Sequence, residues 1–98
     1  IRHTALLTKK IRRVAVCGGS GSFLLPHAIK AGADIFITGD FKYHEFFDAE
    51  GKLIIADVGH FESEQFTQEL LLELITEKFS NFALRLTLQN TNPINYLI

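Results

Sequence analysis

Hydrophobic residues form three short continuous runs in this chain, Val14–Val16 (within a predicted strand over Ile11–Cys17), Ile35–Ile37 and Leu53–Ala56. Continuous apolar runs are typical of buried strands with helices on both faces of the sheet. After each run, apolar residues recur at helical spacing, which predicts helices over roughly 24–31, 41–49 and 61–79. This alternation with short connections predicts an α/β layered fold with a mostly parallel sheet.

The two ends of the chain have different patterns. Residues 1–10 are a polar lead-in with no clear period, and residues 82–88 alternate strictly. Phe82, Leu84, Leu86 and Leu88 share one face of that segment, with Ala83, Arg85 and Thr87 on the other. The alternation predicts a fourth strand at the sheet edge with one face in water. We therefore expect one α/β domain over residues 1–98.

Composition narrows the class of protein. The 98 residues suit one small domain, and 47% hydrophobic content with nine Phe is typical of a packed globular protein. A net charge of −1 gives no general attraction to nucleic acid or anionic membranes, and one Cys allows no internal disulfide. No apolar run approaches the roughly 20 residues of a membrane span. We expect a cytoplasmic protein without a membrane or nucleic-acid partner.

Two further features bear on this expectation. The basic cluster Lys9–Arg13 is interpreted as part of a solvated lead-in rather than as an RNA site. The chain contains no Met and opens with Ile1, so we expect it to be a piece of a longer protein. A site shared with the remainder of that protein would look incomplete here.

Polar and glycine-rich turns follow three of the predicted strands: Gly18–Ser22, Thr38–Asp40 and Asp57–His60. In open α/β sheets, ligands bind beyond the carboxyl ends of the strands. Because parallel strands end at the same edge, these turns are expected to converge. The Gly18–Ser22 loop can bind an anion through backbone N–H groups or can be a plain strand-to-helix turn with a Ser cap.

His60 and Glu64 are the strongest candidate for a binding site. They lie four residues apart at the start of the third predicted helix, so they project from one face. An imidazole nitrogen and a carboxylate suit zinc, manganese or iron. The alternative is a capping His and a Glu favoured by the helix dipole. Asp57 is a further ligand, an acceptor for His60, or a residue that forms the turn.

Asp40 and His44 form a second pair with the same spacing. They are candidates for orienting a metal-bound water or a substrate by acid–base chemistry. The alternative is that Thr38 or Asp40 caps the second helix while His44 lies on the surface. Cys17 is interpreted as a small core residue rather than a nucleophile.

Four blocks of this sequence together resemble a known family. They are Val14–Ser22, Ile37–Asp40 with His44, Gly59–His60 with Glu64, and the ending Thr91–Leu97. In order and spacing they resemble the NGG-interacting-factor-like (Nif-three-like) family of dinuclear metal-centre proteins, often labelled type 2 GTP cyclohydrolase I. The resemblance extends from about Ile11 to the end of the chain.

This resemblance implies a protein of two related α/β lobes that assembles as a homo-hexamer. It implies two divalent metal ions, of zinc, iron or manganese, facing an internal cavity. One His and one Glu from the C-terminal lobe bind these metals, and they correspond to His60 and Glu64. The other ligands, a His pair and an Asp, come from the N-terminal lobe, and this chain has no His-His pair. The chain would then be the C-terminal lobe, with Asp40 and His44 lining the cavity or supporting the ligands.

Three functions follow as hypotheses. The first is a metal-dependent hydrolase, either GTP cyclohydrolase-like or a phosphoesterase, because paired metals activate water and stabilise a developing oxyanion. The second is a non-catalytic assembly or regulatory protein that uses metal to hold its lobes together. Anion or nucleotide binding at Gly18–Ser22 without chemistry is a third hypothesis. The sequence names no catalytic residue beyond the candidates Asp40 and His44.

Overall fold

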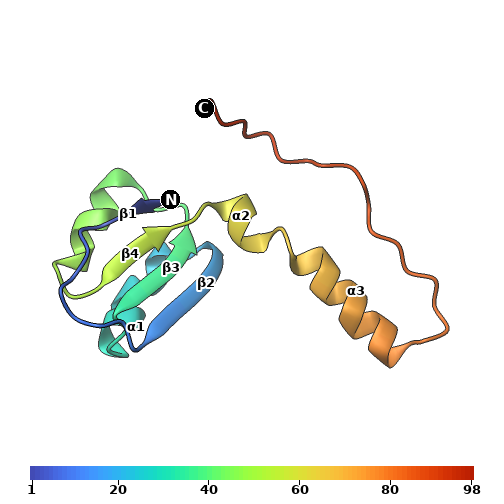
Figure 1. Ribbon diagram of the computed structural model, residues 1–98, viewed down its shortest axis with the longest axis horizontal. Coiled ribbons are helices and arrows are strands. Elements are labelled where there is room, and N and C mark those ends of the chain that lie inside the picture. The colour runs from blue at the N-terminus through green and yellow to red at the C-terminus, as the bar shows by residue number, and fades with distance from the viewer. The chain divides into compact units, whose positions relative to one another are not determined.

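The computed structural model describes all 98 residues, which form two compact units, 1–64 and 65–98. The first unit is built on a sheet of four strands in the order β1–β4–β3–β2 (Figure 1). The strands are β1 (Arg2–His3), β2 (Val14–Ser20), β3 (Ile35–Gly39) and β4 (Ile54–Asp57). The chain therefore has the predicted α/β architecture.

The three apolar strands run parallel, as the sequence predicts. Val14 pairs with Ile35, which in turn pairs with Ile54, so the three strands lie in register at their amino ends. The register of β2 shifts between Val16 and Ser20, where the glycines of this strand lie. A parallel pair needs a crossover connection, and the intervening helical segments provide it.

The lead-in is not simply a polar tail. Arg2 and His3 form β1, which pairs antiparallel with β4 opposite Asp57 and Ala56. Thr4 extends this contact, because its backbone N–H donates to Ile55 O and its hydroxyl accepts from Ile55 N. A two-residue strand is too short to show a period, so only its long-range partners reveal it.

The helical segments of the first unit are short. Residues Ser22–Leu24 form a 3₁₀ turn (η1) that leads into α1 (Leu25–Lys30). Pro26 lies in the first turn of α1, where its missing N–H costs nothing. Gly32 adopts a φ of 71° just beyond this helix and ends it, as predicted. The predicted second helix is a 3₁₀ helix, η2 (Tyr43–Ala49), and α2 covers His60–Glu64.

The core lies between the sheet and the segments α1 and η2. Phe36 and Ile55 are paired across β3 and β4 and point to the same face. They pack against Leu25 and Ala28 of α1 and against Ala49 of η2, together with Phe41, Leu53 and Ala33. Cys17 is half-buried against this core, as expected for a small packing residue.

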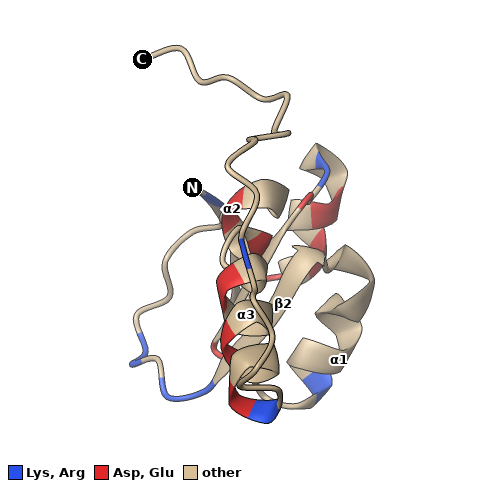
Figure 2. Ribbon diagram, turned by 90° about the vertical axis from the view of Figure 1, so that its right-hand side faces the viewer, with Lys and Arg blue, Asp and Glu red and all other residues tan.

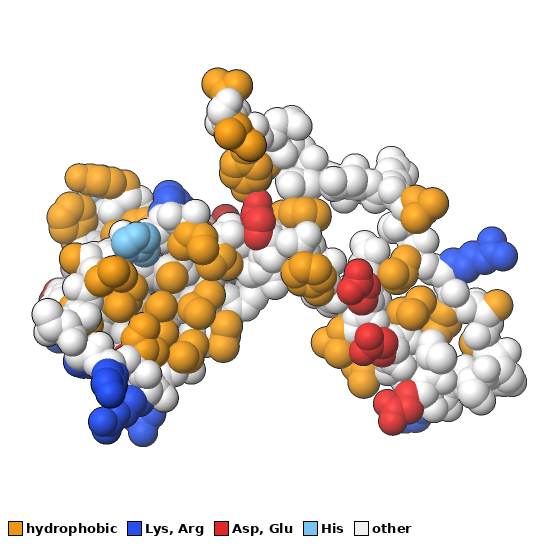
Figure 3. All heavy atoms as spheres, in the orientation of Figure 1, with side chains coloured by type: hydrophobic (Ala, Val, Ile, Leu, Met, Phe, Trp, Pro, Cys, Tyr) orange, Lys and Arg blue, Asp and Glu red, His pale blue; other side chains and the backbone are white.

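The opposite face of the sheet is more open within the first unit. Val14 and Val16 on β2 are 50% and 73% exposed, although they belong to a predicted buried run. Figure 3 shows hydrophobic side chains gathered over the first unit on this side. The expectation that helices cover both faces therefore does not hold for β2 within this unit.

The second unit contains α3 (Thr67–Lys78) followed by a segment without helix or strand. The long helix predicted over 61–79 is interrupted at Gln65–Phe66, between α2 and α3. The predicted edge strand over 82–88 is wrong for this chain, because no other strand pairs with it. Leu84 and Leu86 instead line a hollow with apolar residues of α3.

The cluster Lys9–Arg13 lies on the loop that precedes β2 (Figure 2). There Asp34 accepts hydrogen bonds from the backbone of Arg12 and Arg13 and pairs with Lys9. No helix in the structure combines the length and apolar character that a membrane crossing requires.

Candidate metal centre

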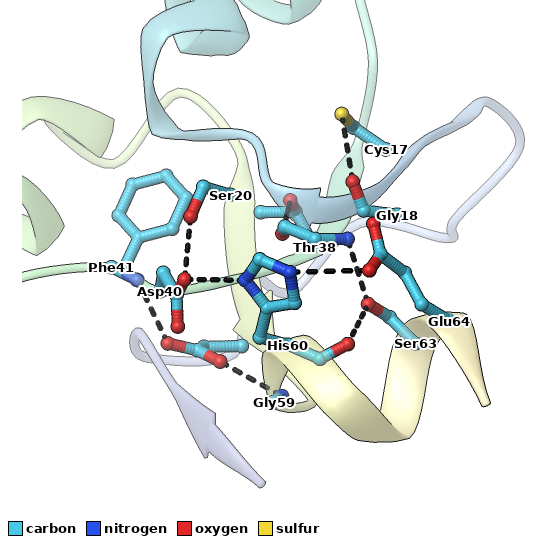
Figure 4. A network of polar contacts seen from close by, with 12 residues as sticks. Cys17, Gly18, Ser20, Thr38, Asp40, Phe41, Gly59, His60, Ser63 and Glu64 are labelled. Atoms are coloured by element: carbon cyan, nitrogen blue, oxygen red, sulfur yellow. Dashed lines mark hydrogen bonds and ion pairs between the residues drawn. The ribbon is translucent and has the colours of Figure 1, made fainter. Parts of the chain in front are cut away.

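The carboxyl ends of three parallel strands converge at one edge of the sheet. Ser20 ends β2, Asp40 follows β3, and His60 opens α2 shortly after β4. Gly39 permits this approach, because a β-carbon there would lie 2.9 Å from His60 N and 3.0 Å from Gly19 O. The predicted convergence of the three turns is therefore confirmed (Figure 4).

His60 and Glu64 face each other on one side of α2. The distance from His60 Nε2 to Glu64 Oε2 is 3.1 Å, and the two side chains are 47% and 49% exposed. Gly19 lies directly beside them with a φ of 69°, and a β-carbon on it would come within 3.3 Å of His60 Cε1. The side-by-side placement expected from their spacing is confirmed, and both groups remain accessible to a ligand.

Asp40 contacts the other nitrogen of the same imidazole. Its Oδ2 lies 2.6 Å from His60 Nδ1 and also accepts a 2.5 Å hydrogen bond from Ser20 Oγ. The hydrogen bonds from Ser20 and His60 lower the pKa of Asp40. The bond to Asp40, helped by the charges of Asp40 and Glu64, raises the pKa of His60. These contacts produce a polar chain in the order Ser20–Asp40–His60–Glu64.

The predicted Asp40–His44 pair does not form. Asp40 lies before η2 in the left-handed backbone region, with a φ of 58°, so the two residues are not separated by one α-helical turn. His44 is exposed, and its ring contacts that of Tyr43. The structure thus brings Asp40 to the His60 site and leaves His44 apart from this polar chain.

Asp57 is a buried hydrogen-bond acceptor rather than an exposed metal ligand at the site. Its Oδ1 accepts from Gly59 N at 2.9 Å, and its Oδ2 accepts from Phe41 N at 2.9 Å and from the Arg2 guanidinium. The residue is 4% exposed. Of the three roles considered for it, forming the turn at the strand end agrees with these contacts.

The glycine-rich loop is tied to α2 by a residue that sequence reasoning missed. Gly19 N donates to Ser63 Oγ at 2.8 Å, and this hydroxyl donates to His60 O at 2.8 Å. No side chain caps η1, so the Ser cap considered as an alternative for this loop is absent. Ser63 lies between His60 and Glu64 in sequence, but only the tertiary contact reveals its role.

The donors present fit a partial metal site. Two atoms bound to one zinc ion, with bonds of about 2.0–2.2 Å, lie about 2.8–3.6 Å apart for octahedral to tetrahedral angles. The 3.1 Å between His60 Nε2 and Glu64 Oε2 lies in that range. No group of three or more His, Cys, Asp or Glu side chains in the chain could hold an ion. Asp40 contacts Nδ1, on the opposite side of the imidazole ring, so it adds no metal ligand on the Nε2 side.

Sequence comparison places the chain in a family. The profile described as Duf34/NIF3 (NGG1p interacting factor 3) matches residues 1–93. The chain belongs to the DUF34/NIF3 family. The resemblance drawn from its motifs is therefore confirmed.

Individual members of the family show the same relationship. The chain is 38% identical over 92 residues to a protein of Lactococcus lactis and 37% identical over 90 residues to one of Campylobacter jejuni. Both proteins are named GTP cyclohydrolase 1 type 2 homolog. These alignments cover 89% and 90% of the chain, but only 34% of each relative.

A solved structure supports the fold. The crystal structure of a Staphylococcus aureus protein matches with a TM-score of 0.77 and 30% identity, covering 98% of this chain and 29% of that protein. The chain thus spans about a third or less of the length of these DUF34/NIF3 relatives. These relatives therefore contain many residues that have no counterpart in this chain.

Proposed function

We propose that this chain supplies two ligands, His60 and Glu64, to a dinuclear divalent-metal site that residues outside the chain complete. The observation that carries the proposal is the 3.1 Å separation of His60 Nε2 and Glu64 Oε2 at the carboxyl edge of the sheet. Both groups are about half-exposed, so they can face donors from elsewhere. Family membership and the short span relative to the relatives support a shared site.

The function proposed for the whole protein is metal-dependent hydrolysis, of GTP in a cyclohydrolase-like reaction or of a phosphoester. Relatives named GTP cyclohydrolase 1 type 2 homolog support this class. Paired metal ions, when bound, supply Lewis acidity and activate water. With metal bound, Glu64 would contribute negative charge and His60 a neutral nitrogen donor, and Gly19 leaves the space beside them free of a side chain.

Metal analysis of the full-length protein tests the proposal. We expect the wild type to carry two divalent ions per chain, and His60→Ala or Glu64→Ala to lose at least one of them. His27→Ala is the matched control, because His27 is an exposed histidine on α1 whose side chain makes no hydrogen bond. Unchanged metal content in both site variants would overturn the ligand assignment.

Turnover separates the first two functional hypotheses. Metal-dependent hydrolysis of GTP or of a phosphoester by the wild type, lost in Glu64→Ala, would support the enzyme. Metal removal that dissociates the oligomer, without turnover of any substrate tested, would support the non-catalytic assembly instead. The oligomer itself, expected to be a hexamer, is measured by light scattering with and without chelator.

A further inference from the structure

A carboxylate faces each ring nitrogen of His60: Asp40 Oδ2 lies 2.6 Å from Nδ1 and Glu64 Oε2 lies 3.1 Å from Nε2. A carboxylate at neutral pH is only an acceptor, so a hydrogen bond between Asp40 Oδ2 and His60 Nδ1 requires the hydrogen on Nδ1. The Asp40 contact is the shorter of the two, so in the neutral ring it retains the hydrogen on Nδ1, and Nε2 carries the free lone pair. Nε2 is also the atom that faces Glu64. The ring is thus oriented with its donor atom toward the other proposed ligand.

Asp40 is itself held in place. Ser20, at the end of β2, donates to the same Oδ2 at 2.5 Å, so the carboxylate lies between two strand ends and α2. Its backbone has a φ of 58°, a conformation that Asp, Asn and Gly accept far better than most residues. Only one other non-glycine residue, Glu50, has a positive φ. An unusual backbone at Asp40 thus coincides with the contact to His60.

We propose that Asp40, oriented by Ser20, is a positioning residue that holds His60 in the Nδ1–H tautomer, so that His60 binds metal through Nε2. This inference rests on the proposed metal site. The physical reason is that a half-exposed imidazole without a partner rotates and exchanges between tautomers, and binding must then select one state. A carboxylate bonded to the second nitrogen removes the free-energy cost of selecting one tautomer and makes the ring a stronger metal ligand.

The first measurement uses the metal-free full-length protein. Ring ¹⁵N chemical shifts of His60 at a pH where the ring is neutral are expected to show a hydrogen on Nδ1 in the wild type. Asp40→Gly removes the acceptor without straining the backbone, and the shifts are expected to move toward a mixture of tautomers. A wild type with its hydrogen on Nε2 would overturn the inference, whatever the variants do.

The second measurement is zinc affinity of the same proteins. We expect Asp40→Gly to weaken binding by about 10–100-fold, as removal of such partners does elsewhere. Asp40→Asn keeps an acceptor oxygen and tolerates the same φ, so this variant is expected to lose less zinc affinity. Ser20→Ala frees the carboxylate and is expected to weaken binding less than Asp40→Gly. Glu50→Gly removes an acidic residue at the other positive φ and is expected to leave affinity unchanged.

The outcomes separate this inference from the proposed function. If His60→Ala loses metal while Asp40→Gly and Asp40→Asn bind zinc as the wild type does, Asp40 is not a positioning residue and the metal site stands. If His60→Ala keeps its metal, the proposed site fails and the role of Asp40 toward metal fails with it. Should Asp40→Gly not fold, Asp40→Asn and the wild-type tautomer still decide.

Discussion

Gly39 lies directly against the backbone of His60: a β-carbon built on Gly39 would come within 2.9 Å of His60 N. It would also lie 2.9 Å from Gly59 C and 3.0 Å from Gly19 O. These are backbone atoms of two other segments, so they cannot move aside as a flexible side chain can. The close approach of three strand ends therefore depends on the absence of a side chain at residue 39.

Gly39→Ala is expected to displace α2 and to lower the free energy of unfolding of the full-length protein by about 1–3 kcal/mol, as overpacking does. Metal content should fall with it, because His60 moves. Gly51→Ala is the control. Gly51 has no atom within 4 Å of its built β-carbon but a φ of 69°, so it tests backbone strain alone. Normal metal content in Gly39→Ala would contradict the packing argument.

Asp57→Ala is expected to destabilise the first unit by about 2–4 kcal/mol, because it leaves one buried and two partly buried donors without their acceptor. The donors are Phe41 N, Gly59 N and the Arg2 guanidinium. Urea unfolding of the full-length protein measures the loss. Asp48→Ala, which truncates an exposed aspartate in η2, should change stability by no more than about 0.5 kcal/mol. Equal effects of the two substitutions would show that the Asp57 contacts contribute little.

The contacts of Asp34 predict that the stability of the fold depends on pH. Its hydrogen bonds from Arg12 N and Arg13 N and its pair with Lys9 lower the pKa of this carboxyl well below its usual value. A group with a depressed folded-state pKa stabilises the fold above its unfolded-state pKa, about 3.9. That contribution is lost progressively as the pH falls below about 4, toward the lower folded-state value.

Unfolding by urea at a series of pH values checks this prediction. Below about pH 4, the wild type should lose stability more steeply than Asp34→Asn, which cannot titrate at this position. Above about pH 5 the wild type should be the more stable of the two. Parallel pH profiles for the two proteins would exclude a role for Asp34.

The isolated chain should bind zinc at least about 100-fold more weakly than the full-length protein, because ligands missing from the first coordination sphere must be replaced by water. Calorimetric titration of both proteins measures the difference, after circular dichroism has established that the isolated chain folds. A tight, stoichiometric site in the isolated monomer would contradict the proposal that residues outside the chain complete it.

The local sequence pattern was enough to predict much of the fold. The apolar runs predicted β2, β3 and β4 and their parallel order, although the bounds of the strands shifted by up to three residues. Gly32 and Pro26 marked the limits of α1. The segment over 82–88 shows the limit of such patterns. Alternation describes which face a strand would bury, but a strand also needs a neighbour for its backbone hydrogen bonds.

The sequence by itself determined that His60 and Glu64 lie side by side, because their spacing matches one helical turn and needs no distant partner. Only the tertiary structure decided the partner of Asp40. Its left-handed backbone turns it away from the helical relation with His44 and toward His60, 20 residues away in sequence. The pairing of Arg2 with Asp57 was likewise hidden, since contacts across 55 residues leave no periodic trace.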